Sequence, residues 1–280
     1  MTDKYAVIGN PIAHSKSPQI HRMFAEQTGQ DISYEAIEAP LDNFEGMIRK
    51  LISQGYKGCN VTVPFKQRAF QLELPGITTI QPEEIDDVQA ANTLIFSNNS
   101  ITLKNTDGTG LVRDIRENQN IPLSHKRILL VGAGGAVQGV IHPILDTSPT
   151  LLIISNRTIE RAVSLIKLIE RRSKYKNIPV KALTFEQLGN EQFDVVINAT
   201  SAGLSDSELP LPTSLFAPGA LAYDMMYGRE TPFMKFARAN GAAVISDGLG
   251  MLVEQAAESF FIWRGVRPET APVIAALRQS

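Results

Sequence analysis

Short apolar runs alternate along the chain with segments whose apolar residues recur every three or four positions. Tyr5 to Ile8 and Ile128 to Val131 are typical of buried strands, whereas Phe44, Ile48 and Leu51 have the spacing of one helix face. This alternation predicts an α/β fold. Strands are expected at 5–8, 33–37, 56–63, 90–96, 101–106, 128–131, 151–154, 180–183, 194–198, 220–225 and 243–245, and helices from Pro18, over 42–53, from Lys66, from Asp107, over 136–145, over 231–240, after 247 and from Pro268.

A glycine turn follows the apolar run that ends at Val131. Gly132 permits a tight turn, and Gly134 lets a pyrophosphate approach the backbone at the start of the next helix. The third glycine of the dinucleotide-binding pattern is replaced by Val137, and a plain strand–turn–helix would look similar locally. The turn therefore predicts a nucleotide-binding unit in mid-chain, preceded by another domain.

The next strand ends without the acidic residue that an NAD-binding unit places there for the ribose. Asn156 and Arg157 occupy this position, and Arg161 lies one helical turn further on. Two guanidinium groups favour a 2′-phosphate, hence NADP, although a solvated helix start is the alternative. A later small-residue turn, 198–203, also follows a strand, where open α/β sheets bind ligands.

The first domain carries two serines in a polar loop. Ser15 and Ser17 lie just before a helix whose first turn contains Pro18. A carboxylate is well placed beside a helix N-terminus and two hydroxyls. The alternative is structural, with Ser17 as the N-cap and Ser15 as an ordinary loop hydroxyl.

Further polar residues follow the strands of this domain. Asn60 and Thr62 alternate with valines and share one face of their strand. Lys66 stands in the first turn of a helix, where the helix dipole disfavours a cation, so a role other than solvation is indicated. Asp107 opens another helix and is either an N-cap or a functional carboxylate.

Composition excludes several classes of protein. With 280 residues, 43% hydrophobic residues and a net charge of −2, the chain has no general attraction to nucleic acid or anionic membranes. Cys59 is the only cysteine, the beginning of the chain has no signal-peptide pattern, and no apolar run is long enough to span a bilayer. No Cys/His cluster has metal-ligand spacing. We expect a cytoplasmic protein without metal, monomeric or a weak homodimer, with a small-molecule substrate.

Taken together and in order, these motifs resemble the shikimate dehydrogenase family over nearly the whole chain. The chain departs from the family at Gln89 and Ala91, where the family usually has glycine and valine, and in an apparently longer segment with Pro75, Gly76 and Pro82. The matching stretches are Gly9 to Ile12 with His14 to Pro18, Asn60 to Lys66, Ala91 to Leu94, Asn105 to Gly108, Gly132 to Ala136, Asn156 to Thr158, Asn198 to Ser201, Tyr223 to Met225 with Tyr227, and Asp247 to Ala256.

The resemblance implies reversible NADPH-dependent reduction of 3-dehydroshikimate to shikimate, on the chorismate route to aromatic amino acids. It implies that Lys66 and Asp107 form the catalytic pair and that Ser15 and Ser17 hold the substrate carboxylate. Ring hydroxyls would be bound by Asn60, Thr62, Asn92, Asp107 and Gln255, with Tyr227 lining the pocket. The cofactor residues implied are Gly132, Ala133, Gly134, Gly135, Ala136, Asn156, Arg157, Thr158, Arg161, Thr200, Met225, Gly248 and Met251.

The domain organisation expected is a substrate-binding catalytic domain, 1–106 with 247–280, and a Rossmann-type NADP-binding domain, 107–246. Two other functions remain open. One is a quinate/shikimate dehydrogenase with relaxed substrate or NAD use, against which Arg157 argues. The other is a non-catalytic NADP-sensing protein on this fold, against which Lys66 and Asp107 argue.

Overall fold

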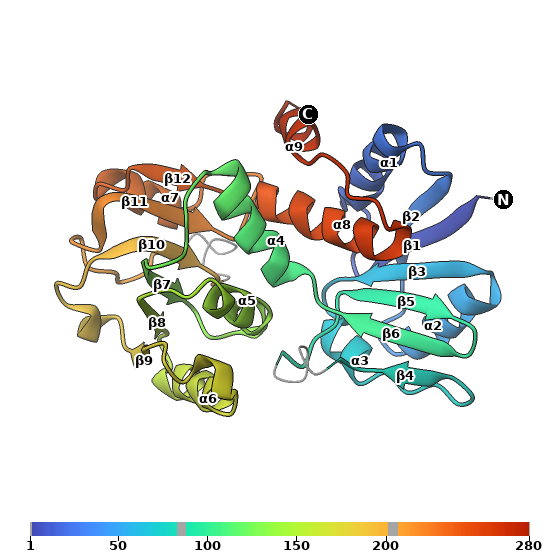
Figure 1. Cartoon of the computed structure of the whole chain (residues 1–280), viewed down its shortest axis with the longest axis horizontal. Helices are drawn as coiled ribbons and strands as arrows, with labels where there is room; N and C mark the ends of the chain where they lie inside the picture. The colour runs from blue at the N-terminus through green and yellow to red at the C-terminus, as the bar shows by residue number, and fades with distance from the viewer. Residues whose placement is uncertain (1, 83–87, 201–206, 280) are drawn as a thin grey trace. The chain divides into compact units, whose positions relative to one another are not determined.

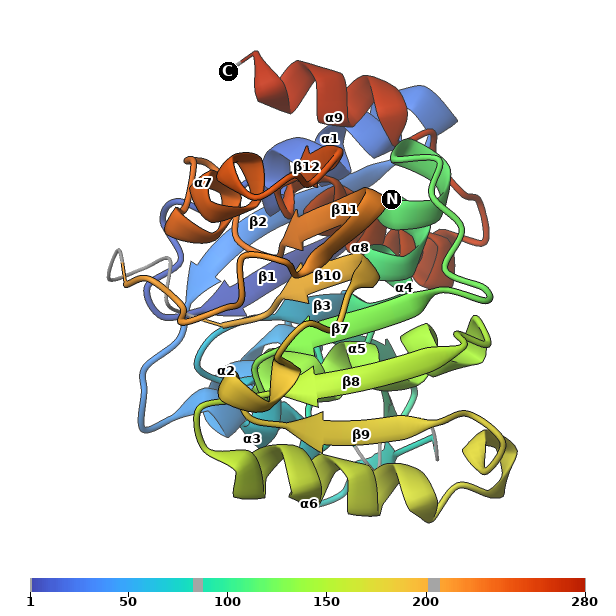
Figure 2. The same cartoon turned by 90° about the vertical axis from the view of Figure 1, so that its left-hand side faces the viewer.

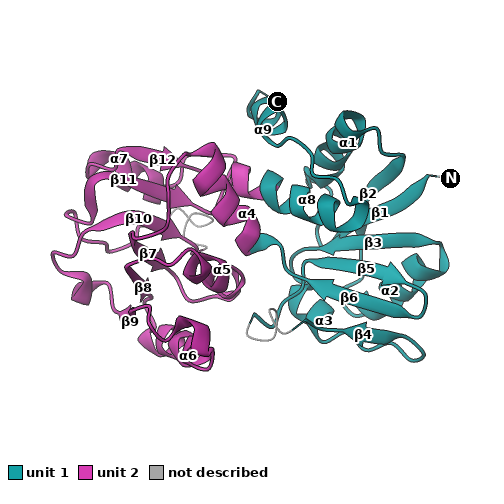
Figure 3. Ribbon diagram, in the orientation of Figure 1, with its two compact units in different colours: residues 1–107, 253–280 teal, residues 108–252 magenta. Residues whose placement is uncertain are grey.

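The computed structural model describes residues 2–82, 88–200 and 207–279. The acidic residues between 83 and 87, and the part of the small-residue turn from Ser201 to Gly203, lie outside this range. The chain divides into two compact units, residues 1–107 with 253–280 (unit 1) and residues 108–252 (unit 2) (Figure 3). The prediction of a two-domain α/β fold is confirmed.

Unit 1 contains a mixed sheet of six strands in the order β2-β1-β3-β5-β6-β4 (Figure 1). Strand β1 pairs in parallel with both β2 and β3, whereas β5 runs antiparallel to β3 and β6. The strands are β1 Asp3–Gly9, β2 Ile32–Glu38, β3 Tyr56–Val61, β4 Thr78–Ile80, β5 Thr93–Ser97 and β6 Ser100–Lys104.

Helices cover both faces of this sheet because strand residues alternate in direction. On one face, Phe44 and Ile48 pack with Ala6 and Ile8 of β1 in a continuous apolar core. On the other, Tyr5 stacks on Trp263, with ring centroids 4.6 Å apart. The helices of this unit are α1 Ser17–Thr28, α2 Phe44–Ser53, α3 Lys66–Phe70, α9 Ala271–Arg278 and the later part of α8, Leu249–Arg264.

Unit 2 contains a fully parallel sheet in the order β12-β11-β10-β7-β8-β9 (Figure 2). When the strands of this unit are numbered from 1 (β7) to 6 (β12) and the sheet is read from β9, the order is 3-2-1-4-5-6, which is the doubly wound order. The switch point lies between β7 and β10. The strands are β7 Arg127–Val131, β8 Leu151–Ser155, β9 Val180–Leu183, β10 Phe193–Asn198, β11 Phe216–Asp224 and β12 Val244–Ser246.

Both faces of the second sheet are buried. Ile128 and Leu130 belong to one apolar core, whereas their neighbours Leu129 and Val131 belong to another. This explains why the strand has no polar alternation in sequence. The helical elements are α4 Asp107–Arg113, whose first residue belongs to unit 1, the π-helix Asp114–Asn118, α5 Gly135–Asp146, α6 Ile159–Glu170, the short helices Ser173–Tyr175 and Glu186–Leu188, α7 Pro232–Ala239 and the beginning of α8.

Several element bounds differ from those expected. Strand β3 ends at Val61 instead of Val63, whose side chain is exposed after the chain has left the sheet. Strand β5 begins at Thr93 because Ala91 donates its N–H to Lys66 O rather than to the sheet. The short strand β4 and the π-helix were not expected. Among the described residues, none of the helices is long and apolar enough to cross a membrane.

Candidate active site

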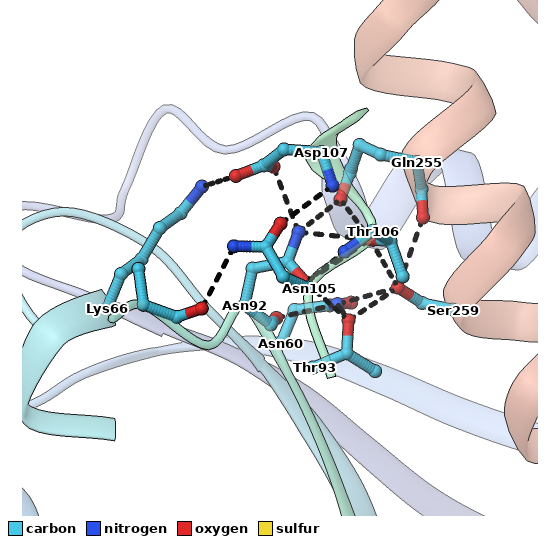
Figure 4. A network of polar contacts seen from close by, with 10 residues as sticks. Asn60, Lys66, Asn92, Thr93, Asn105, Thr106, Asp107, Gln255 and Ser259 are labelled. Atoms are coloured by element: carbon cyan, nitrogen blue, oxygen red, sulfur yellow. Dashed lines mark hydrogen bonds and ion pairs between the residues drawn. The ribbon is translucent and has the colours of Figure 1, made fainter. Parts of the chain in front are cut away.

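Lys66 and Asp107 form an ion pair in unit 1. They are the first residues of α3 and α4, and Lys66 Nζ lies 2.6 Å from Asp107 Oδ2 (Figure 4). Their side chains remain 30% and 18% exposed, so both can contact a bound molecule. Phe65 anchors α3 by stacking on Phe44 at 4.9 Å. Asn105 Oδ1 accepts the N–H of Asp107 at 3.0 Å and fixes the start of α4.

Asn92 holds the second oxygen of Asp107. Its Nδ2 donates to Asp107 Oδ1 at 2.9 Å, and its Oδ1 accepts the backbone N–H of Thr106 at 2.9 Å. Because a backbone N–H only donates, this contact determines which end of the Asn92 amide is oxygen. Asp107 is therefore engaged by Lys66 on one oxygen and by Asn92 on the other.

Asn60 is buried behind Asn92. Its Nδ2 donates to the backbone oxygen of Asn92 at 3.1 Å and to Ser259 Oγ at 3.0 Å. Its Oδ1 accepts from the hydroxyl of Tyr34 at 2.7 Å. The Asn92 carbonyl only accepts, so the amide of Asn60 has one orientation, with oxygen toward Tyr34.

Helix α8 brings Gln255 and Ser259 into the same network (Figure 4). Gln255 Oε1 lies 3.4 Å from both Asn92 Nδ2 and Thr106 Oγ1. Ser259 Oγ lies 2.8 Å from Thr93 Oγ1. Thr93, Thr106 and Ser259 were not predicted from the sequence. Gln255 and Ser259 are four residues apart in the sequence, and this spacing indicates that they share one face of a helix. Ser259 could have been found from this signal.

The serine loop leads into α1. Ser17 is the first helical residue, the N-cap is Lys16, and Ser15 Oγ accepts the N–H of Ser17 at 3.3 Å. The N-cap alternative for Ser17 is therefore wrong. Ser17 is buried close to the hydroxyl of Tyr34. Burial raises the pKa of this hydroxyl, the Cys59 thiol raises it further, and the neighbouring Ser17 lowers it. Thr62, half-buried, follows β3 and donates its N–H to Ile8 O at 2.8 Å.

The cofactor residues expected in unit 2 follow the carboxyl ends of its strands. Backbone hydrogen bonds join the turns after β7, β8, β10 and β11 in one line along this edge, so residues far apart in sequence are neighbours. The bonds are Gly132 N–H to Ser155 O at 2.7 Å, Ala199 N–H to Val131 O at 2.9 Å, Met225 N–H to Asn198 O at 2.9 Å and Gly248 N–H to Met226 O at 2.9 Å. Thr200 lies in this line, where its hydroxyl donates to Asn198 Oδ1 at 2.8 Å.

The glycine turn has the features of a phosphate site. Gly132 has a φ of 115°, which favours glycine, and a side chain at Gly134 or Gly135 would meet nothing within 4 Å. Ala133 is half-buried, and Ala136 is exposed in the first turn of α5. The N-cap Gly134 supplies no side-chain hydrogen bond, so the first N–H groups of this helix can bind an anion.

The turn after β8 presents cations at the same edge. Arg157, Thr158 and Arg161 are exposed, and Asn156 donates to Thr158 O at 2.8 Å. Ser155 is the last residue of the strand before this turn, and its buried hydroxyl has no hydrogen-bond partner among the described residues. The donor set therefore fits the 2′-phosphate of NADP.

Tyr227, Met225, Gly248 and Met251 lie in unit 2. Tyr227 is 37% exposed, so its ring is accessible, and burial of the remainder raises the pKa of its hydroxyl. A Cβ on Gly248 would lie 2.2 Å from Met225 O, so only glycine fits where the beginning of α8 meets the end of β11. Met251 is 9% exposed.

A buried carboxylate, also missed from sequence, braces the beginning of α8. Asp114 accepts from the Tyr223 hydroxyl at 2.6 Å and from Asn118 Nδ2 at 2.9 Å. A Cβ on Gly250 would lie 2.0 Å from Asp114 Oδ1. Among the residues that the structure describes, no group of His, Cys, Asp and Glu could hold a metal ion.

Comparison with known proteins identifies relatives over the whole chain. Family models match residues 7–94 (shikimate dehydrogenase substrate binding domain), 114–205 (shikimate / quinate 5-dehydrogenase) and 248–278 (shikimate 5′-dehydrogenase C-terminal domain). A shikimate dehydrogenase (NADP(+)) of Methylobacillus flagellatus is 54% identical over 276 residues, 99% of each chain.

Solved structures of similar chains share the fold. An Ael1 enzyme from Pseudomonas putida is 45% identical, with a TM-score of 0.91 over 99% of this chain and 98% of the other. The shikimate 5-dehydrogenase of Thermus thermophilus, solved with NADP(H) and shikimate, is 29% identical, with a TM-score of 0.84 over 99% of each chain. Sequence identity along the full length and three family matches in order establish that the chain belongs to the shikimate dehydrogenase family.

Proposed function

We propose that the protein catalyses the reversible NADPH-dependent reduction of 3-dehydroshikimate to shikimate, on the chorismate route to aromatic amino acids. The observation that carries this proposal is the contact of Lys66 Nζ with Asp107 Oδ2 within a network of amide and hydroxyl side chains. Relatives named shikimate dehydrogenase (NADP(+)) match 99% of the chain, and Lys66 and Asp107 lie in stretches that resemble motifs of the family.

Substrate binding belongs to unit 1. Ser15 and Ser17 hold the carboxylate at the beginning of α1, and the ring hydroxyls bind to Asn60, Thr62, Asn92, Asp107 and Gln255. The fixed orientations of Asn60 and Asn92 support this assignment, because pre-oriented donors and acceptors lose little entropy when a polyol binds. Tyr227, in unit 2, is the further residue assigned to the substrate.

Proton transfer is the role of the catalytic pair. In the reduction, the carbonyl carbon of 3-dehydroshikimate gains a hydride and its oxygen gains a proton from Lys66 Nζ. Asp107 orients the amine and accepts a hydrogen bond from the substrate, and in the reverse direction Lys66 takes the proton back. Asn92 keeps the Asp107 carboxylate turned toward Lys66.

NADP is held by unit 2, and its reduced nicotinamide supplies the hydride. Gly132 to Ala136 bind the pyrophosphate, and Asn156, Arg157, Thr158 and Arg161 bind the 2′-phosphate. Thr200, Met225, Gly248 and Met251 line the remainder of the cofactor site along the carboxyl edge of the sheet. Unit 1 is thus the substrate-binding domain and unit 2 the NADP-binding domain, in a cytoplasmic monomer or weak homodimer without nucleic-acid or membrane partners.

Steady-state assays with the purified protein separate this function from its alternatives. We expect shikimate and NADP to give reduced nicotinamide, with kcat/KM at least about tenfold lower when NAD replaces NADP or quinate replaces shikimate, which corresponds to about 1.4 kcal/mol. Comparable rates with quinate or NAD would indicate the relaxed enzyme. NADP binding without turnover would indicate a sensing protein.

A further inference from the structure

Tyr34 lies between two parts of the proposed substrate site without belonging to either. It stands on β2, the edge strand of the first sheet, and its hydroxyl contacts Asn60 Oδ1 at 2.7 Å. Ser17 lies close to the same hydroxyl. Ser15 and Tyr34 also line one groove of about 760 Å³ along α1 and β2. The hydroxyl of Tyr34 therefore contacts Asn60, which is proposed to bind a ring hydroxyl, and the Tyr34 side chain shares a groove with Ser15, which is proposed to bind the carboxylate.

The donors and acceptors of these side chains fix the direction of each hydrogen bond. Asn60 Nδ2 faces the backbone oxygen of Asn92, so Asn60 Oδ1 faces Tyr34. An amide oxygen only accepts, and the single proton of the Tyr34 hydroxyl must be donated to it. The Tyr34 hydroxyl is therefore the donor and Asn60 the acceptor.

The contacts then continue from Asn60 to the catalytic pair. Asn60 Nδ2 donates to Thr93 Oγ1 at 3.1 Å, and Thr93 Oγ1 donates to Asn92 Oδ1 at 2.8 Å. Asn92 Nδ2 then donates to Asp107. An unbroken series of side-chain hydrogen bonds thus connects Tyr34 to the carboxylate beside Lys66.

The ring of Tyr34 is held rigidly. It stacks on the buried ring of His21 with centroids 4.0 Å apart and planes inclined by 7°, and Trp263 lies against it at 6.4 Å. These contacts involve only the ring, so removing the hydroxyl leaves the packing unchanged. Tyr34→Phe is therefore a clean test of the hydroxyl.

We propose that Tyr34 is a positioning residue that holds Asn60 in the orientation that binds a ring hydroxyl of the substrate. The inference rests on the proposed function and adds a residue to its substrate site. Without the hydroxyl, Asn60 Oδ1 is a buried acceptor that has lost its donor.

Steady-state kinetics of Tyr34→Phe test this role. We expect KM for shikimate to rise about 10-fold, with kcat within about threefold of wild type and KM for NADP unchanged, because a buried acceptor has lost its donor while the catalytic pair is untouched. Asn60→Ala should raise KM less in the Tyr34→Phe background than in wild type, because residues in contact are not additive.

Tyr56→Phe is the matched control. It removes a hydroxyl from the same sheet, where Tyr56 donates to Glu35 on β2, and it should leave all three kinetic constants and the coupling unchanged. An active wild type with unaltered KM in Tyr34→Phe would overturn the inference alone. A rise in both KM values together with a lowered melting temperature would show a structural role instead. A wild type that does not oxidise shikimate would overturn the proposed function and this inference with it.

Discussion

Backbone groups orient the amide side chains around Asp107. The N–H of Thr106 and the carbonyl of Asn92 each permit only one end of the facing amide as a partner. Turning either amide side chain around, so that its oxygen and nitrogen change places, would therefore break a buried hydrogen bond and create a repulsive contact. We expect this fixed polarity to favour a hydroxylated ring as the bound molecule.

Asn92→Asp tests the polarity of the amide with no change in size. The new carboxylate would lie about 2.9 Å from Asp107 Oδ1, where two negative charges repel each other and share a proton. We expect kcat for shikimate to fall roughly 10–100-fold, with a changed pH–rate profile, as befits a disturbed acid–base group. Asn99→Asp, on an exposed turn of the same sheet, should have no effect. Normal turnover by Asn92→Asp would refute the assigned orientation.

The buried imidazole of His21 should make the free energy of unfolding depend on pH. Burial lowers its pKa to about 3, with Asn60 opposing, and neither ring nitrogen has a partner in hydrogen-bond geometry among the described residues. An unfolded histidine has a pKa near 6.5, so below this pH the unfolded state binds a proton that the native state excludes. Stability should fall by about 1.4 kcal/mol per pH unit from about pH 6.5 toward pH 3 because of this residue.

Urea unfolding of His21→Gln at pH 7 and pH 5 measures this contribution. The altered packing lowers the free energy of unfolding of the variant at both pH values. Between pH 7 and pH 5, however, this free energy should fall by about 2 kcal/mol less in the variant than in wild type. His14→Gln, at an exposed position, should retain the wild-type dependence. Equal pH dependence in wild type and His21→Gln would show that His21 is not buried neutral.

Elements built from local contacts agree best between sequence and structure. The β7–glycine–α5 unit was predicted because its strand, turn and helix signals are contiguous in the chain. Strand β4 was not, because it has three residues and is defined by its pairing with β6. The π-helix at Asp114 was missed because its buried carboxylate is paired with Tyr223, distant in sequence. Contacts of this kind leave no periodic signal.

In the site, too, residues with a local sequence signal were predicted and residues defined by distant contacts were not. Lys66 and Asp107 were identified because each stands at a helix start within a recognisable motif. Ser259 and Tyr34 were not, because α8 and β2 present them only after the chain has returned to the first sheet. The expected boundary near residue 247 and the observed division after Leu252 differ because Gly248 and Gly250 pack closely on Met225 and Asp114.

The junction of α8 with the π-helix can be tested at Gly250. Alanine in a helix interior is normally more favourable than glycine by about 1 kcal/mol. Here its Cβ would lie 2.0 Å from an Asp114 oxygen held by Asn118, so the clash should outweigh this gain. We expect Gly250→Ala to lower the free energy of unfolding by about 1–3 kcal/mol, measured in urea. Gly135→Ala, where a Cβ meets nothing within 4 Å, should be neutral or stabilising.

The turn between β8 and α6 should set the choice of cofactor. Arg157→Asp replaces a cation of the proposed 2′-phosphate site with an acid suited to the ribose of NAD. We expect the ratio of kcat/KM with NADP to that with NAD to fall at least about tenfold, from the loss of one charge-assisted hydrogen bond. Arg171→Asp makes the same charge change at the other end of α6 and should preserve the ratio. An unchanged ratio in Arg157→Asp/Arg161→Asp would refute the assignment.

At the scale of the whole molecule, the two units have separate cores and separate polar sites. The polar network of unit 1 surrounds an ion pair, and the strand ends of unit 2 present glycines and arginines suited to phosphates. The proposed reaction requires both, because neither unit by itself offers an acid–base pair together with a nucleotide site. The small net charge of −2 suits an enzyme whose ligands are small anions bound at local sites.

The kcat for shikimate oxidation by Lys66→Ala, Asp107→Ala and the double variant, with saturating NADP, tests this account most directly. We expect Lys66→Ala to lower kcat at least about 100-fold while KM for shikimate changes only a few-fold, the size of effect of a general acid–base group. Asp107→Ala should act similarly, and the double variant should be little worse than either, since the two residues act as a unit. Near-normal kcat in Lys66→Ala, or a loss confined to KM, would contradict the assignment of Lys66 as the proton-transfer group.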